Sequence, residues 1–312
     1  MGQPWQGLHR SLFGKYFVVL FVAVVAPLLA GGIGNAWFGY RDQRAMLDAL
    51  LQLEAASAAG QIRNFLDGIR DQLGWTVQLD WRPGSEEQHR RDAFRVLRQA
   101  PAVAAITLVD GQGTERLHVS RVDLNRSGSG IDRSADPAVS GASTAGAWYG
   151  PVTYSAATEP FMVVAVAGNR PTVGIALADV NLKLIRDVIT GIRIGTTGHA
   201  FVTDRWGRLV AHPDISQVLR GTDDATAAGL RALRAKVAAA GGAMALQSHD
   251  GEAVLAAVAP IAGVDWTVFV EQPVAEALAP IRAALWRTGG LMLAGTLLAG
   301  LLACWPMASP GA

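Results

Sequence analysis

Residues 198–214 read GHAFVTDRWGRLVAHPD and have the pattern of a β-hairpin. Asp204 is suited to cap the backbone N–H groups of a tight turn, and Gly207 supplies the positive φ that a four-residue loop needs. The earlier stretch LVDGQGTERL, residues 108–117, has the same form: a strand, an aspartate, two residues, a glycine and a second strand. The two stretches predict two related hairpins, one in each half of the chain.

The segments around the two hairpins follow one order, which indicates an internal duplication. A helical segment leads into each hairpin, the first beginning near Ser85 and the second covering residues 181–192. Further strands follow each hairpin, and in the second half an alanine-rich helix at 225–240 precedes them. The repeated order predicts an α+β fold with two antiparallel-sheet modules. The modules are expected at residues 81–180 and 181–280.

A long stalk helix is expected before the first module. From Tyr40 to Leu79, apolar residues recur at the three- and four-residue steps of one helix face. The stretch RPGS at 82–85 ends this pattern, so the helix is assigned to residues 40–80. At 1.5 Å per residue it would exceed about 50 Å and would need a partner along its length, either the chain's own modules or a second copy. The apolar positions are Met46, Leu50, Leu53, Phe65, Ile69 and Leu73.

Two uncharged runs flank this central region. Residues 17–40 and 288–312 contain no charged side chain, and each run is long enough to cross a hydrocarbon core of about 30 Å. Transmembrane helices surrounded by membrane lipid are therefore expected at 17–39 and 286–306. Basic residues before the first run predict that residues 1–16 stay in the cytoplasm, and two spans return residues 307–312 to that side. A cleaved signal peptide is the alternative for the first run, which is long for a signal core.

Charge and motifs exclude several classes of function. All but two of the 27 Lys and Arg residues and all 26 Asp and Glu residues lie between the two runs, without a basic cluster, so no nucleic-acid partner is expected. The only cysteine, Cys304, lies in the second run, so the central region must be stabilised by its core. No nucleophile elbow, zinc-protease motif or phosphate-binding loop occurs. The sequence predicts no enzyme and no cofactor, and a membrane-anchored extracytoplasmic enzyme is the alternative.

The histidines of the second hairpin have two interpretations. If Thr203 pairs with Arg208, His199 lies opposite His212, and Asp214 is near enough to complete a zinc-like site. Alternatively, the two rings only pack across an ordinary hairpin, and a one-residue bulge would separate them. No third histidine or cysteine lies nearby at metal spacing, so the second interpretation is favoured and no metal is predicted.

Three stretches resemble the double Cache sensory regions of bacterial transmembrane receptors. They occur in the family's order between the two uncharged runs, and the likeness spans most of residues 40–280. The resemblance implies two PAS-like modules stacked on a long N-terminal helix, with the ligand usually in the membrane-distal module. The stretches are WYGPVTYSAATEPFMVVAVAG (148–168), ADVNLKLIRDVITGIRIGTTGHAFVTDRWGRLVAHPDISQVLRGTD (178–223) and WTVFVEQPVAEAL (266–278).

The resemblance also implies a function and a location. Such regions are small-ligand sensors of histidine kinases, nucleotide cyclases and chemoreceptors, and cytoplasmic HAMP helices connect them to an output domain. Here LLACWPM is followed by ASPGA, where a basic HAMP segment is expected, so the chain is expected to lack its output domain. We expect a signalling segment of the bacterial inner membrane, with periplasmic or extracellular modules and both termini in the cytoplasm. The alternative is a stand-alone binding partner of full-length receptors.

Candidate ligand-binding residues lie in the distal module. Trp148, Tyr149 and Tyr154 lie on a strand interrupted by glycine and proline, and Asp179 ends a later strand. Aromatic walls with one carboxylate suit a small amine-bearing ligand. Amino-acid-sensing relatives place an arginine two residues before the tryptophan, whereas this chain has Gly146 there.

Each candidate also has an ordinary structural role. Trp148 and Tyr149 suit packing on a sheet, and Asp179 suits capping of the helix that follows it. Arg121 and Arg116, from the first hairpin, are candidate partners for an anion, although a solvated strand edge is the commoner role. The expected ligand is a small polar molecule: an amine, an amino acid or a carboxylate.

A parallel homodimer is expected along the stalk helix and the second span. Small residues spaced four apart let helices approach closely in lipid. Alanines in the stalk helix offer a further seam for tight helix contact. These residues are Gly295, Ala299 and Ala303 in the span and Ala55, Ala56, Ala58 and Ala59 in the stalk.

Overall fold

The computed structural model describes residues 6–154, 159–241, 243–248 and 251–308. By contacts it divides into two compact units. One contains the helical ends, up to Ala49 and from Val274 onward, and the other contains Leu50–Pro273. Within the part of the chain that is described, no helix combines the length and hydropathy needed to cross a membrane. Both expected spans, 17–39 and 286–306, include residues whose side chains lie outside the described part.

The unit of the chain ends is helical. It contains the first part of α1 (Gln6–Thr76), together with α7 (Val274–Ala277) and α8 (Ala279–Ala308). Gly32 of α1 lies directly against the Met292 side chain of α8, and a β-carbon at this glycine would collide with that side chain. Pro27 lies inside α1 without ending the helix.

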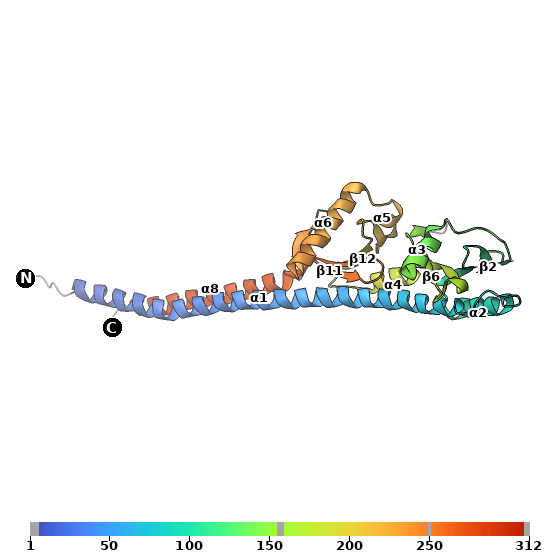
Figure 1. The fold of residues 1–312 in the computed structure, drawn as a ribbon. Helices are drawn as coiled ribbons and strands as arrows, with labels where there is room; N and C mark the ends of the chain where they lie inside the picture. Colours follow the sequence, from blue (N-terminus) through green and yellow to red (C-terminus); the bar gives the residue numbers. More distant parts are fainter. Residues whose placement is uncertain (1–5, 155–158, 242, 249–250, 309–312) are drawn as a thin grey trace, which may run out of the picture. The chain divides into compact units, whose positions relative to one another are not determined.

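The second part of α1 is the base on which the sheets are built (Figure 1). One stripe of this helix is buried at steps of three and four residues, which is the spacing of a single helix face. Met46, Leu50 and Leu53, expected on the apolar face, are instead exposed, with 76%, 42% and 65% of their surface accessible. The stripe that the modules cover consists of Leu51, Ala55, Ala58, Ile62, Leu66, Ile69 and Leu73.

The burial of α1 corrects one detail of the expected dimer seam. Ala55, Ala58 and Ala59 are buried within the chain itself, and of the four stalk alanines only Ala56 is exposed. A buried alanine is not available to a second copy. Any seam between two stalk helices must therefore use the face that carries Met46 and Leu53.

The first module, at residues 81–180 and called the distal module below, is an antiparallel sheet with helices on both faces. Its strands run in the order β3-β2-β1-β7-β6-β4, and β5 pairs with β6. Helices α1 and α2 (Glu86–Gln99) lie below the sheet in Figure 1, whereas α3 (Pro137–Ala145) lies above it. The strands are β1 (Val103–Val109), β2 (Glu115–Ser120), β3 (Arg126–Ser127), β4 (Ala147–Tyr149), β5 (Thr153–Tyr154), β6 (Pro160–Ala167) and β7 (Ile175–Asn181), and a short 3-10 helix covers Pro171–Val173.

The second module, at residues 181–280 and called the proximal module below, repeats this plan. It is entered through α4 (Lys183–Gly191), and its strands run in the order β10-β11-β12-β8-β9. Helix α6 (Asp224–Ala240) covers one face and packs on Phe201 and Phe269, while α5 (Ile215–Leu219) follows β9. The strands are β8 (His199–Thr203), β9 (Leu209–Ala211), β10 (Met244–Gln247), β11 (Ala253–Ile261) and β12 (Trp266–Pro273).

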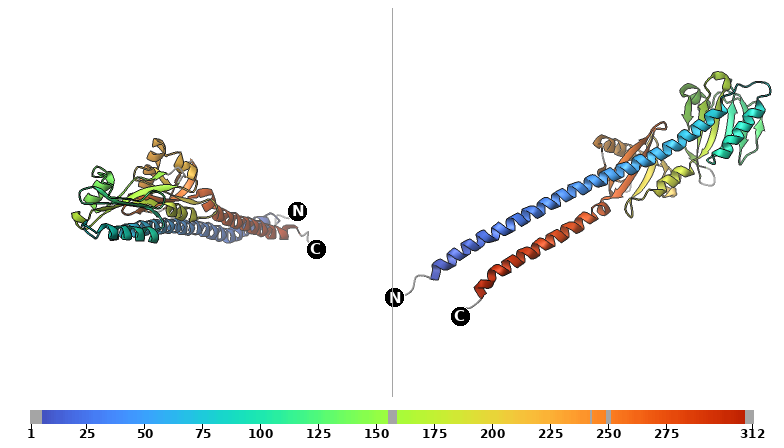
Figure 2. Two further views of the ribbon diagram at one scale, coloured as in Figure 1. Left: turned by 90° about the vertical axis from the view of Figure 1, so that its right-hand side faces the viewer. Right: turned by 90° about the horizontal axis from the view of Figure 1, so that it is seen from below.

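The duplication expected from the two hairpins is confirmed. The order β2-β1-β7-β6-β4 of the distal sheet matches β9-β8-β12-β11-β10 of the proximal sheet, strand for strand. In each turn the aspartate Oδ1 accepts two backbone N–H bonds, at 3.0 Å for Asp110 and 2.9 Å for Asp204. Gly113 and Gly207 have φ of 85° and 82°, as the turns require. Figure 2 shows the two sheets following one another along α1.

The pairing of the second hairpin differs from expectation by one residue. Thr203 pairs with Leu209 rather than Arg208, and a register shift separates this pair from the next, Val202 with Ala211. Bulges of this kind add one residue to one strand and increase its twist. The rings of His199 and His212 nevertheless remain neighbours, with centroids 5.5 Å apart in an edge-on arrangement.

Candidate functional site

The face of the distal sheet on which α3 packs carries two of the candidate residues, Trp148 and Asp179. Trp148 on β4 pairs with Ala165 on β6, and Ala165 pairs with Leu177 on β7. Because side chains two apart on a strand share a face, Asp179 lies on the same face as Trp148 and Leu177. Helix α3 packs on the part of this face around Ala165 and Leu177. Asp179 lies one step beyond that cluster and is exposed.

Asp179 is accessible to solvent yet is surrounded by protein. Among the described residues, none forms an ion pair or a side-chain hydrogen bond with its carboxylate. Desolvation raises the pKa of Asp179, while the charges of His118 and Arg133 lower it and that of Asp123 raises it. The residue is exposed, yet its carboxylate is partly desolvated. An acid held this way is a candidate for binding a cation.

The neighbours of Asp179 are themselves held by hydrogen bonds. Thr107 pairs with Leu177 across the sheet, and its Oγ1 lies 2.9 Å from Nδ1 of His118 on β2. Arg133 donates to the buried carboxylate of Glu115, with Nε 2.9 Å from Oε2. These groups were not expected from the sequence. Their only signal is cross-strand pairing, which requires the register of the sheet.

Trp148 is fixed by two glycines. A β-carbon at Gly141 of α3 or at Gly150 after β4 would clash with the indole ring, so the ring lies in close contact with both positions. The side chain is half-buried and packs against the cluster beneath α3. Gly146, at the position where the resemblance implies an arginine, has φ of 82° at the end of α3. An arginine here would be strained, because L-residues with side chains rarely adopt this conformation.

The other candidate residues are directed elsewhere. Tyr149 follows Trp148 on the strand and therefore faces α1; burial raises its pKa, and Arg70 and Asp67 of α1 are the nearest charges acting on it. Arg116 stacks over Trp81 at 5.8 Å from the ring centroid and lies 3.8 Å from Oδ2 of Asp110. Both side chains are thus on the opposite face of the sheet from Asp179.

Arg121 and Tyr154 bind backbone oxygens. The Nε of Arg121 donates to the carbonyl of Val103 at 2.9 Å, which ties the loop after β2 to the start of β1. The Tyr154 hydroxyl donates to the carbonyl of Val210 at 3.0 Å, and so joins β5 to the second hairpin. Burial raises the pKa of Tyr154 to about 12, so this hydroxyl stays protonated near neutral pH.

Three of the predicted residues also meet at a second place. Trp148, Tyr149 and Tyr154 line a cleft of about 640 Å³ whose other wall comes from the hairpin turn of the proximal module. Trp206 in that wall lies under two guanidinium groups, Arg205 at 4.2 Å and Arg208 at 4.7 Å from the ring centroid. Asp179 is not part of this cleft. The structure therefore places the predicted aromatic residues in one cleft and the predicted carboxylate outside it.

The second hairpin does not gather metal ligands among the described residues. No group of three or more His, Cys, Asp or Glu side chains there is placed to hold a metal ion. Asp214, the third ligand in the less favoured zinc interpretation, accepts from the backbone N–H of Ser216 at 3.0 Å and caps α5. Hydrogen bonding to Ser216, through its side chain and through its backbone N–H, lowers the pKa of Asp214.

The proximal module has a closed counterpart of the Asp179 position. Asp179 pairs with Ala105 in the distal sheet, and Glu271 pairs with His199 in the proximal sheet. Ala105 and His199 each lie five residues before the aspartate of their own hairpin turn, so Glu271 corresponds to Asp179. Asp179 is exposed, whereas Glu271 is completely buried and accepts a hydrogen bond from Ser248 Oγ at 2.8 Å. The duplicated acid is therefore open to solvent in the distal module alone.

The aromatic pair beside Glu271 explains this closure. Phe201 and Phe269 occupy the places of Thr107 and Leu177, and their rings stack 4.9 Å apart under α6. Two phenyl rings occupy this position in the proximal module, where the distal module has the smaller side chains of Thr107 and Leu177.

The Cache domain model matches residues 42–281, which is most of the chain and includes both modules. The chain belongs to the Cache domain family. Comparison with functionally curated proteins gives no significant match. The family expected from the sequence is thus confirmed, and so is a mixed fold of helices and two antiparallel sheets with a long N-terminal helix.

Solved Cache-type structures share this fold at low sequence identity. The ligand-binding domain of the Pseudomonas aeruginosa amino acid chemoreceptor PctC, in complex with GABA, is 18% identical, with a TM-score of 0.51 and coverage of 69% of this chain and 94% of that one. The ligand-binding domain of the Pseudomonas fluorescens chemoreceptor CtaA, in complex with L-isoleucine, is 18% identical, with a TM-score of 0.54 and coverage of 77% and 97%. The extracellular domain of a protein described as a histidine kinase, soHK1S-Z6, is 21% identical, with a TM-score of 0.54 and coverage of 78% and 99%.

Proposed function

We propose that this Cache chain is an extracytoplasmic sensor that binds a small amine-bearing molecule at Asp179 of the distal module. The observation that carries the proposal is the contrast between two duplicated acids. Asp179 is exposed without a cation partner among the described residues, while its counterpart Glu271 is buried. Keeping a desolvated carboxylate without a partner costs stability, which a bound ammonium group would offset.

The ligands of structural relatives support an ammonium group as the anchor. The PctC and CtaA domains were solved with GABA and with L-isoleucine, and a third chemoreceptor domain, PctB of Pseudomonas aeruginosa, with L-Gln. All three molecules carry an ammonium group. Arg133 is the arginine whose charge acts on the pKa of Asp179, and its guanidinium group already donates to the carboxylate of Glu115. We therefore place amines and amino acids ahead of simple carboxylates as ligands.

Replacing Asp179 with asparagine is expected to weaken ligand binding at least about tenfold, because a charged hydrogen-bond partner is lost. The same change should leave the ligand-free protein as stable as before or more stable. Asn removes a charge that the fold desolvates, as the raised pKa of Asp179 indicates. Thermal-shift titrations of the full chain with amines and amino acids measure both effects. A variant that binds as tightly as the native chain would contradict the site.

The affinity should also depend on pH. Because the pKa of Asp179 is raised from its usual 3.8, the carboxylate becomes protonated at a less acidic pH than an ordinary aspartate. Binding of an ammonium ligand should therefore weaken as pH falls toward that raised pKa, and the asparagine variant should show no such loss. Ser120→Ala, on β2 two strands away from Asp179, is a control that leaves the charge in place.

We further propose that the two uncharged runs, 17–39 and 286–306, anchor the sensor in a bacterial inner membrane with the modules outside the cytoplasm. The support is the sequence, in which no charge interrupts residues 17–40 or 288–312. Ligand binding in the distal module would shift the packing of α1, and the spans would carry this shift inward.

In a homodimer, α1 of one copy would shift relative to α1 of the other copy. Met46, Leu50 and Leu53 are exposed on one face of α1, opposite the stripe that the modules cover. Exposed apolar side chains at helical spacing are typical of an interface. We propose that this face pairs with its copy in a parallel dimer.

Single cysteines on this face are expected to cross-link between chains in native membranes. Met46→Cys, Leu50→Cys and Leu53→Cys, made in a Cys304→Ser background, should each form a disulfide-linked dimer. Ala55→Cys and Ala58→Cys are matched controls, because these positions are buried in the chain itself. Cross-linking that is equal at all five positions, or absent from the first three, would argue against the dimer.

A further inference from the structure

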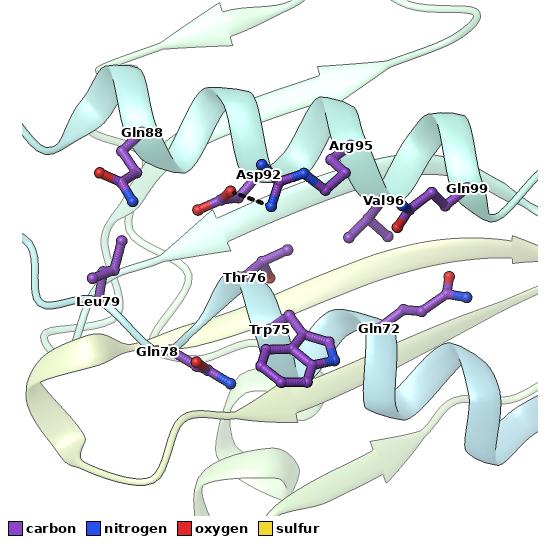
Figure 3. A pocket seen from close by; sticks show the side chains of 10 residues that line it. All are labelled: Gln72, Trp75, Thr76, Gln78, Leu79, Gln88, Asp92, Arg95, Val96 and Gln99. Carbon is purple, nitrogen blue, oxygen red and sulfur yellow. Dashed lines mark ion pairs between the residues drawn. The ribbon is translucent and has the colours of Figure 1, made fainter.

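A groove on the lower side of the distal module is unrelated to the Asp179 face. It lies between the C-terminal end of α1, with the residues that follow it, and α2 (Figure 3). Its volume is about 430 Å³, which is within the range of small-molecule pockets. Thr76 and Val96 are buried, and Thr76 Oγ1 donates to the carbonyl of Leu73 at 2.7 Å.

An aromatic ring forms part of the groove lining. Trp75 has 68% of its surface exposed, although it is one of the largest apolar side chains of the module. Its neighbour on the α2 side of the groove, Val96, is buried, and Leu79 is exposed. An exposed indole face at the side of a hollow can stack on the apolar face of a ring-shaped ligand.

Amide side chains line the groove on both of its sides. Gln72 and Gln78 line the groove from the α1 side, and Gln88 and Gln99 line it from α2 (Figure 3). Among the described residues, none forms a side-chain hydrogen bond with any of these four amides. The Oε1 atom of Gln72 is buried and has no hydrogen-bond partner. A buried acceptor without a donor costs free energy, and rotation of the Gln72 amide toward the groove would let a ligand hydroxyl satisfy it.

The charges of the groove cancel. Asp92 and Arg95 are its only ionisable lining residues, and Oδ1 of Asp92 lies 3.3 Å from Nη1 of Arg95. Their side chains are therefore available as hydrogen-bonding groups without a net charge. This chemistry differs from that of Asp179, whose unpaired carboxylate calls for a cation.

We propose that the groove between α1 and α2 binds a neutral saccharide of one or two rings. The apolar face of a sugar ring would stack on Trp75, and its hydroxyl groups would donate to and accept from the surrounding amides, beginning with Oε1 of Gln72. A neutral, hydroxyl-rich molecule matches an uncharged groove with many unused amide groups. The site is separate from the amine site and does not rest on it.

Titration of the full chain with D-glucose, D-galactose, N-acetylglucosamine and maltose, followed by calorimetry, tests the proposal. At least one of these sugars should bind, and Trp75→Ala should weaken that binding about tenfold through loss of the stacking surface. Gln72→Met, which keeps the length of the side chain, should weaken it about three- to tenfold. Because Trp75 is exposed, its replacement should leave the unfolding temperature unchanged.

Two control variants test whether the sugar binds in this groove rather than elsewhere on the chain. Trp206→Ala removes an exposed tryptophan of the proximal module, and Asp179→Asn removes the proposed amine site; neither should change sugar binding. Absence of binding for all four sugars up to about 10 mM would overturn the proposal. It would also fail if Trp75→Ala leaves sugar binding intact, or if its only effect is to dissociate a dimer, since the groove would then be an interface between copies.

Discussion

Replacing Phe201 with alanine is expected to lower the free energy of unfolding of the proximal module by about 3–5 kcal/mol. Phe201 has no exposed surface, and its ring lies parallel to that of Phe269 with centroids 4.9 Å apart. Leu230, Leu233 and Val237 of α6 belong to the same cluster. Truncation would remove a stacked aromatic pair and leave a cavity between the sheet and α6, which rigid strands cannot collapse to fill.

Urea unfolding of the full chain, followed by circular dichroism, measures this loss. Leu219→Ala is the matched control, because 43% of Leu219 is exposed at the end of α5 and its truncation should cost less than about 1 kcal/mol. If the two variants lose equal stability, Phe201 is not the centre of the proximal core. A loss confined to one of two unfolding transitions would assign Phe201 to a module that unfolds separately.

The fold follows from local features of the sequence to a large extent. The turn chemistry of Asp110 and Gly113, repeated at Asp204 and Gly207, depends only on residues within four positions, so the two hairpins could be predicted. The duplication follows from them, and the strand orders of the two sheets confirm it. The helix expected to begin near Ser85 could also be predicted from the sequence, and α2 does begin directly after Ser85.

Helix α3 was missed although it has a local signal. Asp136 accepts a hydrogen bond from the N–H of Ala138 at 2.9 Å, Pro137 occupies the first turn, and Gly146 follows the end with positive φ. Aspartate before proline and a glycine after the helix are start and stop signals. The intervening residues are small and lack an apolar period, and this concealed the helix.

The face of α1 that the modules bury could not be predicted from periodicity. Apolar residues occur on two sides of this helix, and both sides satisfy a helical spacing. Leu51 and Ile62 are buried, while Met46 and Leu53 are exposed. Only the tertiary packing of the two sheets distinguishes the two faces.

The candidate site depended on strand register to an even greater degree. Trp148 and Tyr149 are adjacent in sequence, yet they point to opposite faces of the sheet, so only Trp148 shares a face with Asp179. His118 joins the site through its cross-strand pairing with Thr107, eleven residues away. Such pairs depend on where β1, β2 and β7 align, which no single segment specifies.

Replacing Glu115 with glutamine is expected to destabilise the distal module by about 3 kcal/mol or more, because two arginines would lose a buried counter-charge. Glu115 is completely buried at the start of β2. Its carboxylate accepts from Nε and Nη2 of Arg133 at 2.9 and 2.8 Å and from Ser129 Oγ at 3.0 Å, and Nε of Arg126 lies 3.6 Å away. This side chain ties the loop that carries Ser129 and Arg133 to the sheet, together with backbone hydrogen bonds such as that from Arg133 N–H to the carbonyl of Gly113 at 2.7 Å. Glu87→Gln is the control, since Glu87 pairs with Arg90 in solvent and its loss should cost less than about 1 kcal/mol.

The pH dependence of the difference in stability between the native chain and Glu115→Gln would identify charge as the cause of that difference. Burial alone would raise the pKa of Glu115, but the hydrogen bonds from Arg133 and Ser129 and the charges of Arg133 and Arg126 outweigh it and hold the pKa below the usual 4.5. The contribution of Glu115 is therefore complete above about pH 4.5 and is lost as pH falls through the lower pKa of the folded protein. The native chain and Glu115→Gln should differ most near neutral pH and converge in acid, because protonated glutamate, like glutamine, leaves the arginines without a counter-charge. A difference that stays constant down to strongly acidic pH would mean that shape, not charge, makes Glu115 important.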